Sequence, residues 1–139
     1  MNKSEIEKLL PHRDAMLLLD ELLCGEDGTA HGKYTVRGDE WFLRGHFPGN
    51  PVVPGVIQCE MAAQTCAALL SGKISGRTPL YTGIDKVRFR RIVRPGDTIC
   101  FDCALTRERD PFFNAHGEAY VDGELCMSGE FSFMLKEND

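Results

Sequence analysis

Apolar residues are spaced differently in different parts of the chain, and this spacing predicts one long helix among several strands. From Val56 to Ser71, apolar side chains fall on every side of a helical projection, and Glu60 is the one charged residue. Such a run predicts a helix of about 16 residues, roughly 24 Å long, buried on most of its sides. Gly72 provides a natural end.

Strand-like runs fill most of the remaining sequence. They cover residues 16–23, 29–36, 81–93, 98–107, 112–121 and 124–135. Asp122-Gly123, between the last two runs, is a strong signal for a two-residue hairpin turn. One buried helix and a set of antiparallel strands predict a single α+β domain over residues 1–139, with the helix packed on a curved sheet.

The first residues of the chain have the pattern of a short polar helix. Ser4 and Glu7 have the spacing of a capping box, and Pro11 is expected to end the helix. Because no apolar signal-type core follows this polar start, we expect the protein to stay in the cytoplasm.

Composition narrows the class of protein further. The chain has 139 residues, of which 42% are hydrophobic and 27% charged, a balance typical of soluble globular domains. Its formal net charge of −5 argues against a general affinity for nucleic acid. No apolar run approaches the ~20 residues that a membrane-spanning helix needs.

Six cysteines raise the question of disulfides or a metal site. A chain of this length builds a core without cross-links, so we expect reduced thiols. Cys100 and Cys103 have the spacing of half a zinc site. On a strand, however, residues three apart point to opposite faces, so the two sulfurs diverge and no metal site is predicted.

Two titratable residues are candidates for acid–base chemistry. His46 lies in residues 45–55, which contain three prolines and three glycines and cannot form regular structure. Glu60 lies in the buried helix, where burial raises the pKa of a carboxyl and leaves a proton donor near neutral pH. The sequence is equally compatible with a structural alternative, in which the Glu60 carboxylate is bonded to the backbone and His46 lies in solvent.

The start of the helix adds a site for negative charge. Pro54-Gly55 opens the helix, so the N–H groups of the first turn point into the preceding loop. They would stabilise a carbonyl oxygen that gains negative charge. Gln64 lies one turn beyond Glu60 on the same face, within reach of its carboxyl or of a bound ligand.

These residues belong to a longer motif. Residues 45–64, GHFPGNPVVPGVIQCEMAAQ, resemble the signature of the β-hydroxyacyl-acyl-carrier-protein dehydratases of type II fatty-acid synthesis. Further segments are similar to that family in the same order: LPHR at 10–13, LLD at 18–20, GIDKVRFRR at 83–91, RPGD at 94–97 and VDG at 121–123. The resemblance implies a hot-dog fold, an antiparallel sheet of about six strands around one long central helix.

The resemblance also implies a reaction and roles for residues. The (3R)-hydroxyacyl chain on the phosphopantetheine of acyl carrier protein would lose water to give the trans-2-enoyl thioester, with no metal or redox cofactor. His46 would be the base and Glu60 the acid, while the Gly55 N–H polarises the thioester carbonyl. The implied substrate-binding residues are Phe47, Val56 and Gln64. The family forms homodimers, some assembled as trimers of dimers, with each active site between two subunits.

A basic stripe indicates where the carrier would dock. It consists of Lys86, Arg88, Arg90 and Arg91. In a strand, alternation places the first three on one face, opposite the apolar Val87 and Phe89. Carrier proteins are acidic, so complementary charge would speed docking; an ordinary solvated strand face would show the same pattern.

Other functions remain open at this stage. Glu60, where dedicated dehydratase–isomerases have aspartate, favours a simple dehydratase without excluding added isomerase activity. An acyl-thioester hydrolase of the same fold would need a carboxylate placed to activate water, and a non-catalytic acyl-binding module would not need His46. Asp14-Ala15 and Met61 depart from the family pattern, which leaves loop shape and chain-length preference open.

Overall fold

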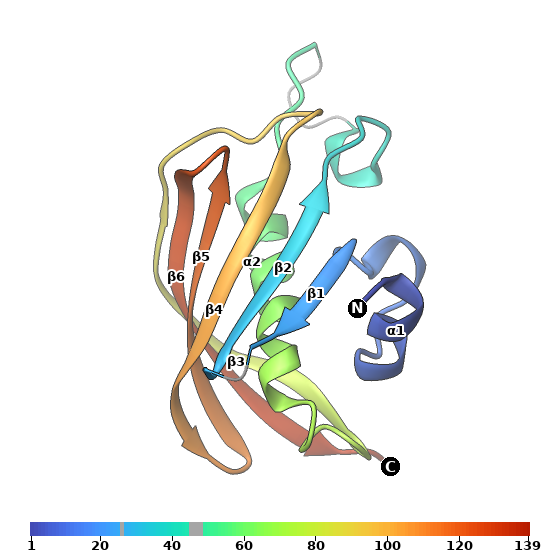
Figure 1. Cartoon of the computed structure of the whole chain (residues 1–139), viewed down its shortest axis with the longest axis vertical. Helices are drawn as coiled ribbons and strands as arrows, with labels where there is room; N and C mark the ends of the chain where they lie inside the picture. Colours follow the sequence, from blue (N-terminus) through green and yellow to red (C-terminus); the bar gives the residue numbers. More distant parts are fainter. Residues whose placement is uncertain (26, 45–48) are drawn as a thin grey trace.

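The computed structural model describes residues 1–25, 27–44 and 49–139. Six antiparallel strands form one sheet in the order β1-β2-β4-β5-β6-β3, and this sheet curves around α2 (Figure 1). The elements are α1 (Lys3–Leu9), η1 (Asp14–Met16), β1 (Glu21–Cys24), β2 (Thr29–Thr35), η2 (Trp41–Leu43), α2 (Gly55–Cys66), η3 (Ala67–Leu70), β3 (Arg77–Phe89), β4 (Thr98–Arg109), β5 (Phe112–Val121) and β6 (Glu124–Glu137). The predicted α+β hot-dog architecture is confirmed.

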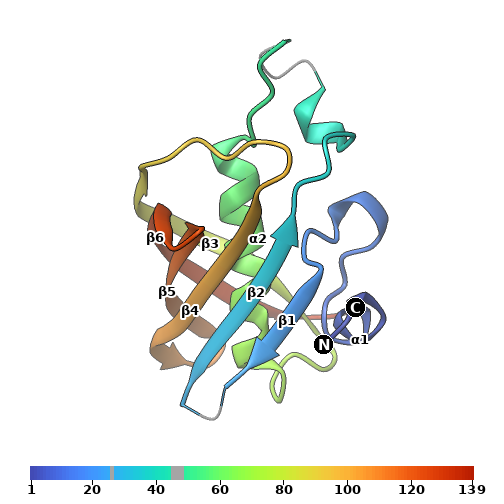
Figure 2. The same ribbon diagram turned by 45° about the horizontal axis from the view of Figure 1, so that its top comes forward.

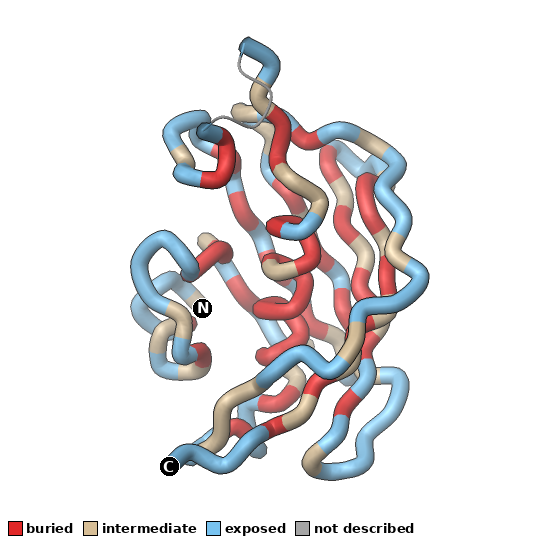
Figure 3. Tube along the Cα trace, turned by 180° about the vertical axis from the view of Figure 1, so that it is seen from behind, coloured by how far each residue is buried: buried red, intermediate tan, exposed pale blue. Residues whose placement is uncertain are grey.

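Helix α2 is the core of the domain. Nine of its 12 residues are buried, and Figure 3 shows it lying against the buried inner face of the sheet. The α-helix ends at Cys66, and a 3₁₀ turn continues to Leu70, so the predicted helix was too long by a turn as an α-helix. The sheet approaches closely at Gly32, where a Cβ would lie 2.3 Å from Thr65 Oγ1.

The N-terminal segment differs from its prediction. The N-cap of α1 is Asn2, not Ser4: the Glu5 N–H donates to Asn2 Oδ1 at 3.0 Å and Glu5 Oε1 accepts from the Asn2 N–H at 3.3 Å. Asparagine caps a helix as well as serine. The earlier start also leaves the terminal ammonium of Met1 within 2.7 Å of the Leu22 carbonyl oxygen.

The first predicted strand is also shorter than expected. Residues 17–20 lie outside the sheet, and β1 begins only at Glu21. Leu17, Leu18 and Leu19 are all buried, which a strand with one solvent face does not allow. Their burial reflects packing beneath the sheet edge, and the Leu18 N–H is bonded to the side chain of Gln64 at 2.9 Å.

The C-terminal strands match the prediction closely. The turn at Asp122-Gly123 has φ values of 50° and 77°, the left-handed conformations that this hairpin turn requires. Cys103 lies on the buried face of β4 and its thiol contacts the Ala62 carbonyl oxygen, whereas Cys100 lies on the opposite face. The two sulfurs therefore diverge, as predicted, and all six cysteines are free.

Strand β3 forms one end of the sheet and, among the described residues, pairs with β6 alone. It begins four residues before the predicted start and ends at Phe89 rather than Val93, because residues 90–93 leave the sheet to meet the segment before α2. There the Val53 N–H donates to the Val93 carbonyl oxygen at 2.8 Å. Figure 2 shows this segment at the end of the sheet where α2 begins. In the described stretches of chain, no helix has the length and apolarity to cross a membrane.

Candidate active site

Glu60 projects from the middle of α2 into a small cavity of about 50 Å³. Burial raises the pKa of its carboxyl, while a hydrogen bond from Gln64 acts in the opposite direction. The polar side chains that line the cavity are His12, Glu60 and Gln64. The rest of the wall is largely hydrophobic and consists of Leu10, Ala63, Ala67, Leu70, Pro79, Tyr81 and Phe133. A carboxyl in such surroundings retains its proton to a higher pH than one in water, as a general acid requires.

Gln64 holds this carboxyl in place. Its Nε2 donates to Glu60 Oε2 at 3.4 Å and to the Met16 carbonyl oxygen at 2.8 Å, while its Oε1 accepts from the Leu18 N–H at 2.9 Å. The predicted contact between Gln64 and Glu60 is confirmed. Because Gln64 is itself buried and bonded on three sides, it can orient the carboxyl with little loss of freedom on substrate binding.

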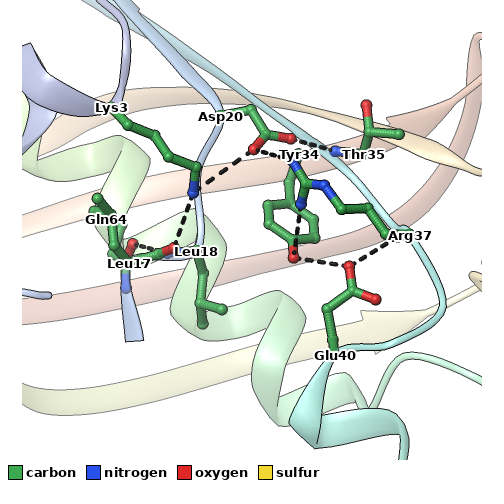
Figure 4. Close-up of polar contacts among 9 residues, drawn as sticks. All are labelled: Lys3, Leu17, Leu18, Asp20, Tyr34, Thr35, Arg37, Glu40 and Gln64. Carbon is green, nitrogen blue, oxygen red and sulfur yellow. Dashed lines mark hydrogen bonds and ion pairs between the residues drawn. The ribbon is translucent and has the colours of Figure 1, made fainter. Parts of the chain in front are cut away.

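The segment that holds Gln64 is anchored to β2 by a polar network (Figure 4). Asp20 accepts from the Thr35 N–H at 2.8 Å and from the Arg37 guanidinium at 2.9 Å. Glu40 accepts from the Tyr34 hydroxyl at 2.8 Å and from the Arg37 N–H at 2.8 Å. These bonds fix residues 17–20 to the end of β2, so they also fix the backbone groups that Gln64 contacts.

His12 is a residue of this site to which sequence reasoning gave no role. Its Nε2 lies 3.7 Å from Glu60 Oε2, and its buried Nδ1 has no hydrogen-bond partner among the described residues. Burial, and then the charge of Arg13, lower the pKa of His12. The shift favours the neutral imidazole of His12, and burial favours the protonated carboxyl of Glu60 beside it. The signal in the sequence was the LPHR segment, but a histidine after a proline carries no specific chemistry alone.

The start of α2 forms a second, separate site. Its N-cap is Pro54, which supplies no side-chain cap, and within the described residues the N–H groups of Gly55 and Val56 meet no acceptor. These N–H groups are the ones expected to stabilise a carbonyl oxygen that gains negative charge, and that role stays a prediction. A groove lies beside it, lined by residues 52–56 together with Gln58, Phe89 and residues 90–92. Val56 is exposed at this groove and is not part of the Glu60 cavity.

The basic stripe follows the predicted alternation only in part. A β-bulge lies between Asp85 and Arg88, and Lys86 adopts a left-handed φ of 52° within it. Lys86 is therefore outside the alternation; the bulge adds one residue to β3 relative to β6. Arg88, opposite Ser128, faces away from the helix, while Arg90 follows the end of the strand. Arg91 lies beside them with its guanidinium paired to Glu124 at 3.1 Å.

Comparison with known proteins places this arrangement in a family. Residues 10–130 match the profile described as FabA-like domain. The chain belongs to the FabA-like family. Its relatives include the 3-hydroxyacyl-[acyl-carrier-protein] dehydratase FabZ of Oenococcus oeni, at 45% identity over 98% of this chain and 100% of the relative. The FabZ of Moorella thermoacetica is 42% identical over 99% and 98%. These relatives confirm the resemblance and the dehydratase class that it implied.

Solved structures show the same fold in more distant proteins. A chain of the dehydratase heterocomplex ApeI:P from Xenorhabdus doucetiae superimposes with a TM-score of 0.82 at 21% identity, covering 96% of this chain and 91% of that one. A hypothetical thioesterase protein with coenzyme A, from Streptococcus pneumoniae, gives a TM-score of 0.65 at 9% identity, covering 85% of this chain and 86% of that one. Because proteins named as a dehydratase and as a thioesterase share this fold, these similarities bear on the fold alone.

For this FabA-like chain, the predicted site residues divide into three groups. Glu60 and Gln64 meet in the cavity, and Gly55 and Val56 meet in the groove. The predicted base His46 and the predicted substrate contact Phe47 lie outside the described residues. Their roles, like that of the basic stripe, remain predictions.

Proposed function

We propose that this chain removes water from (3R)-hydroxyacyl-acyl-carrier-protein to give the trans-2-enoyl thioester in acyl-chain synthesis, with Glu60 as general acid and His46 as general base. The observation that carries the proposal is the partly buried, Gln64-bound carboxyl of Glu60, whose pKa is raised, in a chain whose FabZ relatives are named for this dehydration. A cytoplasmic location remains a prediction of the sequence.

The reaction uses the N–H group at the start of α2, the base His46 and the acid Glu60 together. The thioester carbonyl oxygen accepts a hydrogen bond from the Gly55 N–H, which stabilises the charge that develops when His46 takes the α-proton. The electron pair of that C–H bond forms the double bond between the α- and β-carbons. The bond from the β-carbon to oxygen breaks, Glu60 protonates the departing hydroxyl, and water leaves.

The geometry of α2 supports a site built by two copies of the chain. Glu60 lies five positions after Gly55, so its side chain is turned about 140° around the helix from that residue. The groove and the cavity share no lining residue, so one copy presents the carbonyl site and the acid on different sides. We infer that the reacting carbon lies between the groove of one protomer and the cavity of its partner.

Strand β3 supplies a surface for that dimer. Among the described residues its ladder is paired on one side only, and it exposes the apolar side chains of Leu80 and Ile84. An unpaired edge with apolar side chains is suited to self-complementary pairing about a two-fold axis. The homodimer is therefore part of the proposal; its further assembly as a trimer of dimers stays a prediction.

The carrier would approach from the groove side. Lys86, Arg88 and Arg90 are exposed, and Arg90 and Arg91 line the groove. A carrier docked on these cations would present its phosphopantetheine arm to the start of α2, and the complementary charge would raise its rate of association.

The test is turnover of acyl-carrier-protein substrates. We expect wild-type protein to hydrate crotonyl-acyl-carrier-protein, followed as loss of enoyl absorbance, and His46→Ala and Glu60→Gln each to lose at least about 100-fold. Release of free thiol would indicate a hydrolase instead, and formation of a cis-3-enoyl product from a longer trans-2-enoyl substrate would indicate added isomerase activity. The proposal would be contradicted if folded wild-type protein bound acyl-carrier-protein but turned over substrates of no chain length.

A further inference from the structure

The ring of Phe89 occupies the space directly beside Gly55. A Cβ placed on Gly55 would lie 2.5 Å from Phe89 Cζ, 2.8 Å from Cε1 and 2.9 Å from Cε2. Real carbon atoms do not approach so closely, since nonbonded carbons are in contact at about 3.5–4.0 Å. The gap between the ring and the first residue of α2 is therefore too narrow for a single added methyl group.

The bulge in β3 is what turns this ring toward the helix. Ile84 pairs with Phe131 and faces inward, so unbroken alternation would turn Phe89 outward. Between Asp85 and Arg88 the strand advances three residues while β6 advances two, and the extra residue reverses the alternation. Phe89 then pairs with Met127 on the inner face, and the Arg90 N–H fixes the strand end by donating to the Cys126 carbonyl oxygen at 2.7 Å.

Phe89 is at the same time open to the groove. About half of its surface is exposed (52%), as is that of Ile92, and Val56 on the opposite side is more exposed still. The ring is thus a wall of the groove rather than part of the core. A ligand group that reaches the Gly55 N–H through this groove must pass along the face or edge of the ring.

We propose that Phe89 makes the site selective for acyl thioesters that carry no substituent on the α-carbon. This inference rests on the proposed function, in which the thioester oxygen accepts from the Gly55 N–H at about 2.9 Å. The α-carbon is two bonds from that oxygen, so it lies beside the start of α2. A methyl group on the α-carbon that points toward β3 would meet the Phe89 ring, which already fills the space beside Gly55.

The experiment compares two substrates in one assay. Wild-type protein and variants are given 3-hydroxybutyryl-acyl-carrier-protein and its 2-methyl analogue, and kcat/KM is measured for each. We expect wild type to prefer the unbranched substrate by at least about 10-fold, the discrimination that one methyl group can produce. Phe89→Leu should shift the ratio toward the branched substrate by about 10-fold, and Phe89→Tyr should keep the wild-type ratio.

Phe112→Leu is the matched control, since Phe112 is equally exposed, at 51%, but lies at the start of β5 away from the groove. It should leave both rates unchanged. The ratio is also insensitive to partial unfolding, because both substrates meet the same fraction of active protein.

Two results would overturn the inference while leaving the proposed function intact. One is a wild type that accepts both substrates equally. The other is a Phe89→Leu variant that lowers both rates by the same factor. A folded wild type without activity on the unbranched substrate would overturn the proposed function itself, and this inference with it.

Discussion

The two sides of helix α2 are built on different principles. Around Glu60 the walls are mostly apolar and one polar side chain holds the acid: Gln64 makes three hydrogen bonds, to the acid and to the N-terminal segment. Around Gly55 the site is an open groove shaped by the Phe89 ring and by a helix start without a side-chain cap. The comparison indicates that the acid side controls a proton, through pKa and orientation, whereas the carbonyl side controls which groups can enter.

The largest expected effect tests whether the two sides act in different protomers. His46→Ala and Glu60→Gln chains, each inactive alone, are unfolded together, refolded as an equal mixture and assayed. If each site combines His46 of one copy with Glu60 of the other, half of the dimers are mixed and carry one intact site, so activity should return to about a quarter of wild type. The control is each variant refolded alone, and a mixture that stays inactive would place both residues in one chain.

A change at Gln64 should disturb only the acid side. Gln64→Met leaves the Leu18 N–H and the Met16 carbonyl without their partners, which costs roughly 1–3 kcal/mol of unfolding free energy, and we expect kcat to fall by about 10-fold or more. Because the bond from Gln64 lowers the pKa of Glu60, its loss raises that pKa. The fall of kcat/KM at high pH should therefore move to higher pH.

The second buried glutamine of α2 provides the control for this experiment. Gln58 is 3% exposed, and its Nε2 donates to the Val53 carbonyl oxygen at 3.3 Å on the groove side. Gln58→Met should leave the high-pH limb where it is in wild type. Identical pH profiles for the two variants would show that Gln64 does not act through Glu60.

A smaller effect is expected when the groove is filled by one methyl group. Gly55→Ala places a Cβ against the Phe89 ring; the ring is half exposed and can move, so the fold should persist while kcat/KM falls by about 10-fold. Phe89→Leu in the same chain should restore part of that loss, which a double-mutant cycle measures. The high-pH limb should not move, and a shift there would contradict the separation of the two sides.

The sequence could predict features that depend on residues close together in the chain, but not those that depend on residues far apart. The buried helix, the Asp122-Gly123 turn and the contact between Gln64 and Glu60 depend on neighbours within a few residues, and these predictions were confirmed. His12 is 48 positions from Glu60 in sequence and meets it only through packing of the N-terminal segment. The bulge at Lys86 is also a property of pairing with β6, so it could not be predicted from the alternation of β3 alone.

The smallest expected effect concerns stability, and it isolates the acid side without any substrate. Burial raises the pKa of Glu60 in the folded state above its ordinary value near 4.5. Folded protein then holds this proton more tightly than unfolded protein, so the contribution to stability is complete below pH 4.5 and is lost as pH rises through the raised pKa. Glu60→Gln carries no such proton.

Wild type should therefore lose stability relative to Glu60→Gln as pH rises from about 4 to 8, by roughly 1 kcal/mol for each unit by which the pKa is raised. Urea unfolding of both proteins across this range measures the difference, and dimer concentration is held constant throughout. A difference that is independent of pH would mean that Glu60 is as easily ionised in the fold as in water. The Glu60 side of α2 would then hold a carboxylate in position without keeping it protonated, and another residue would have to be the general acid.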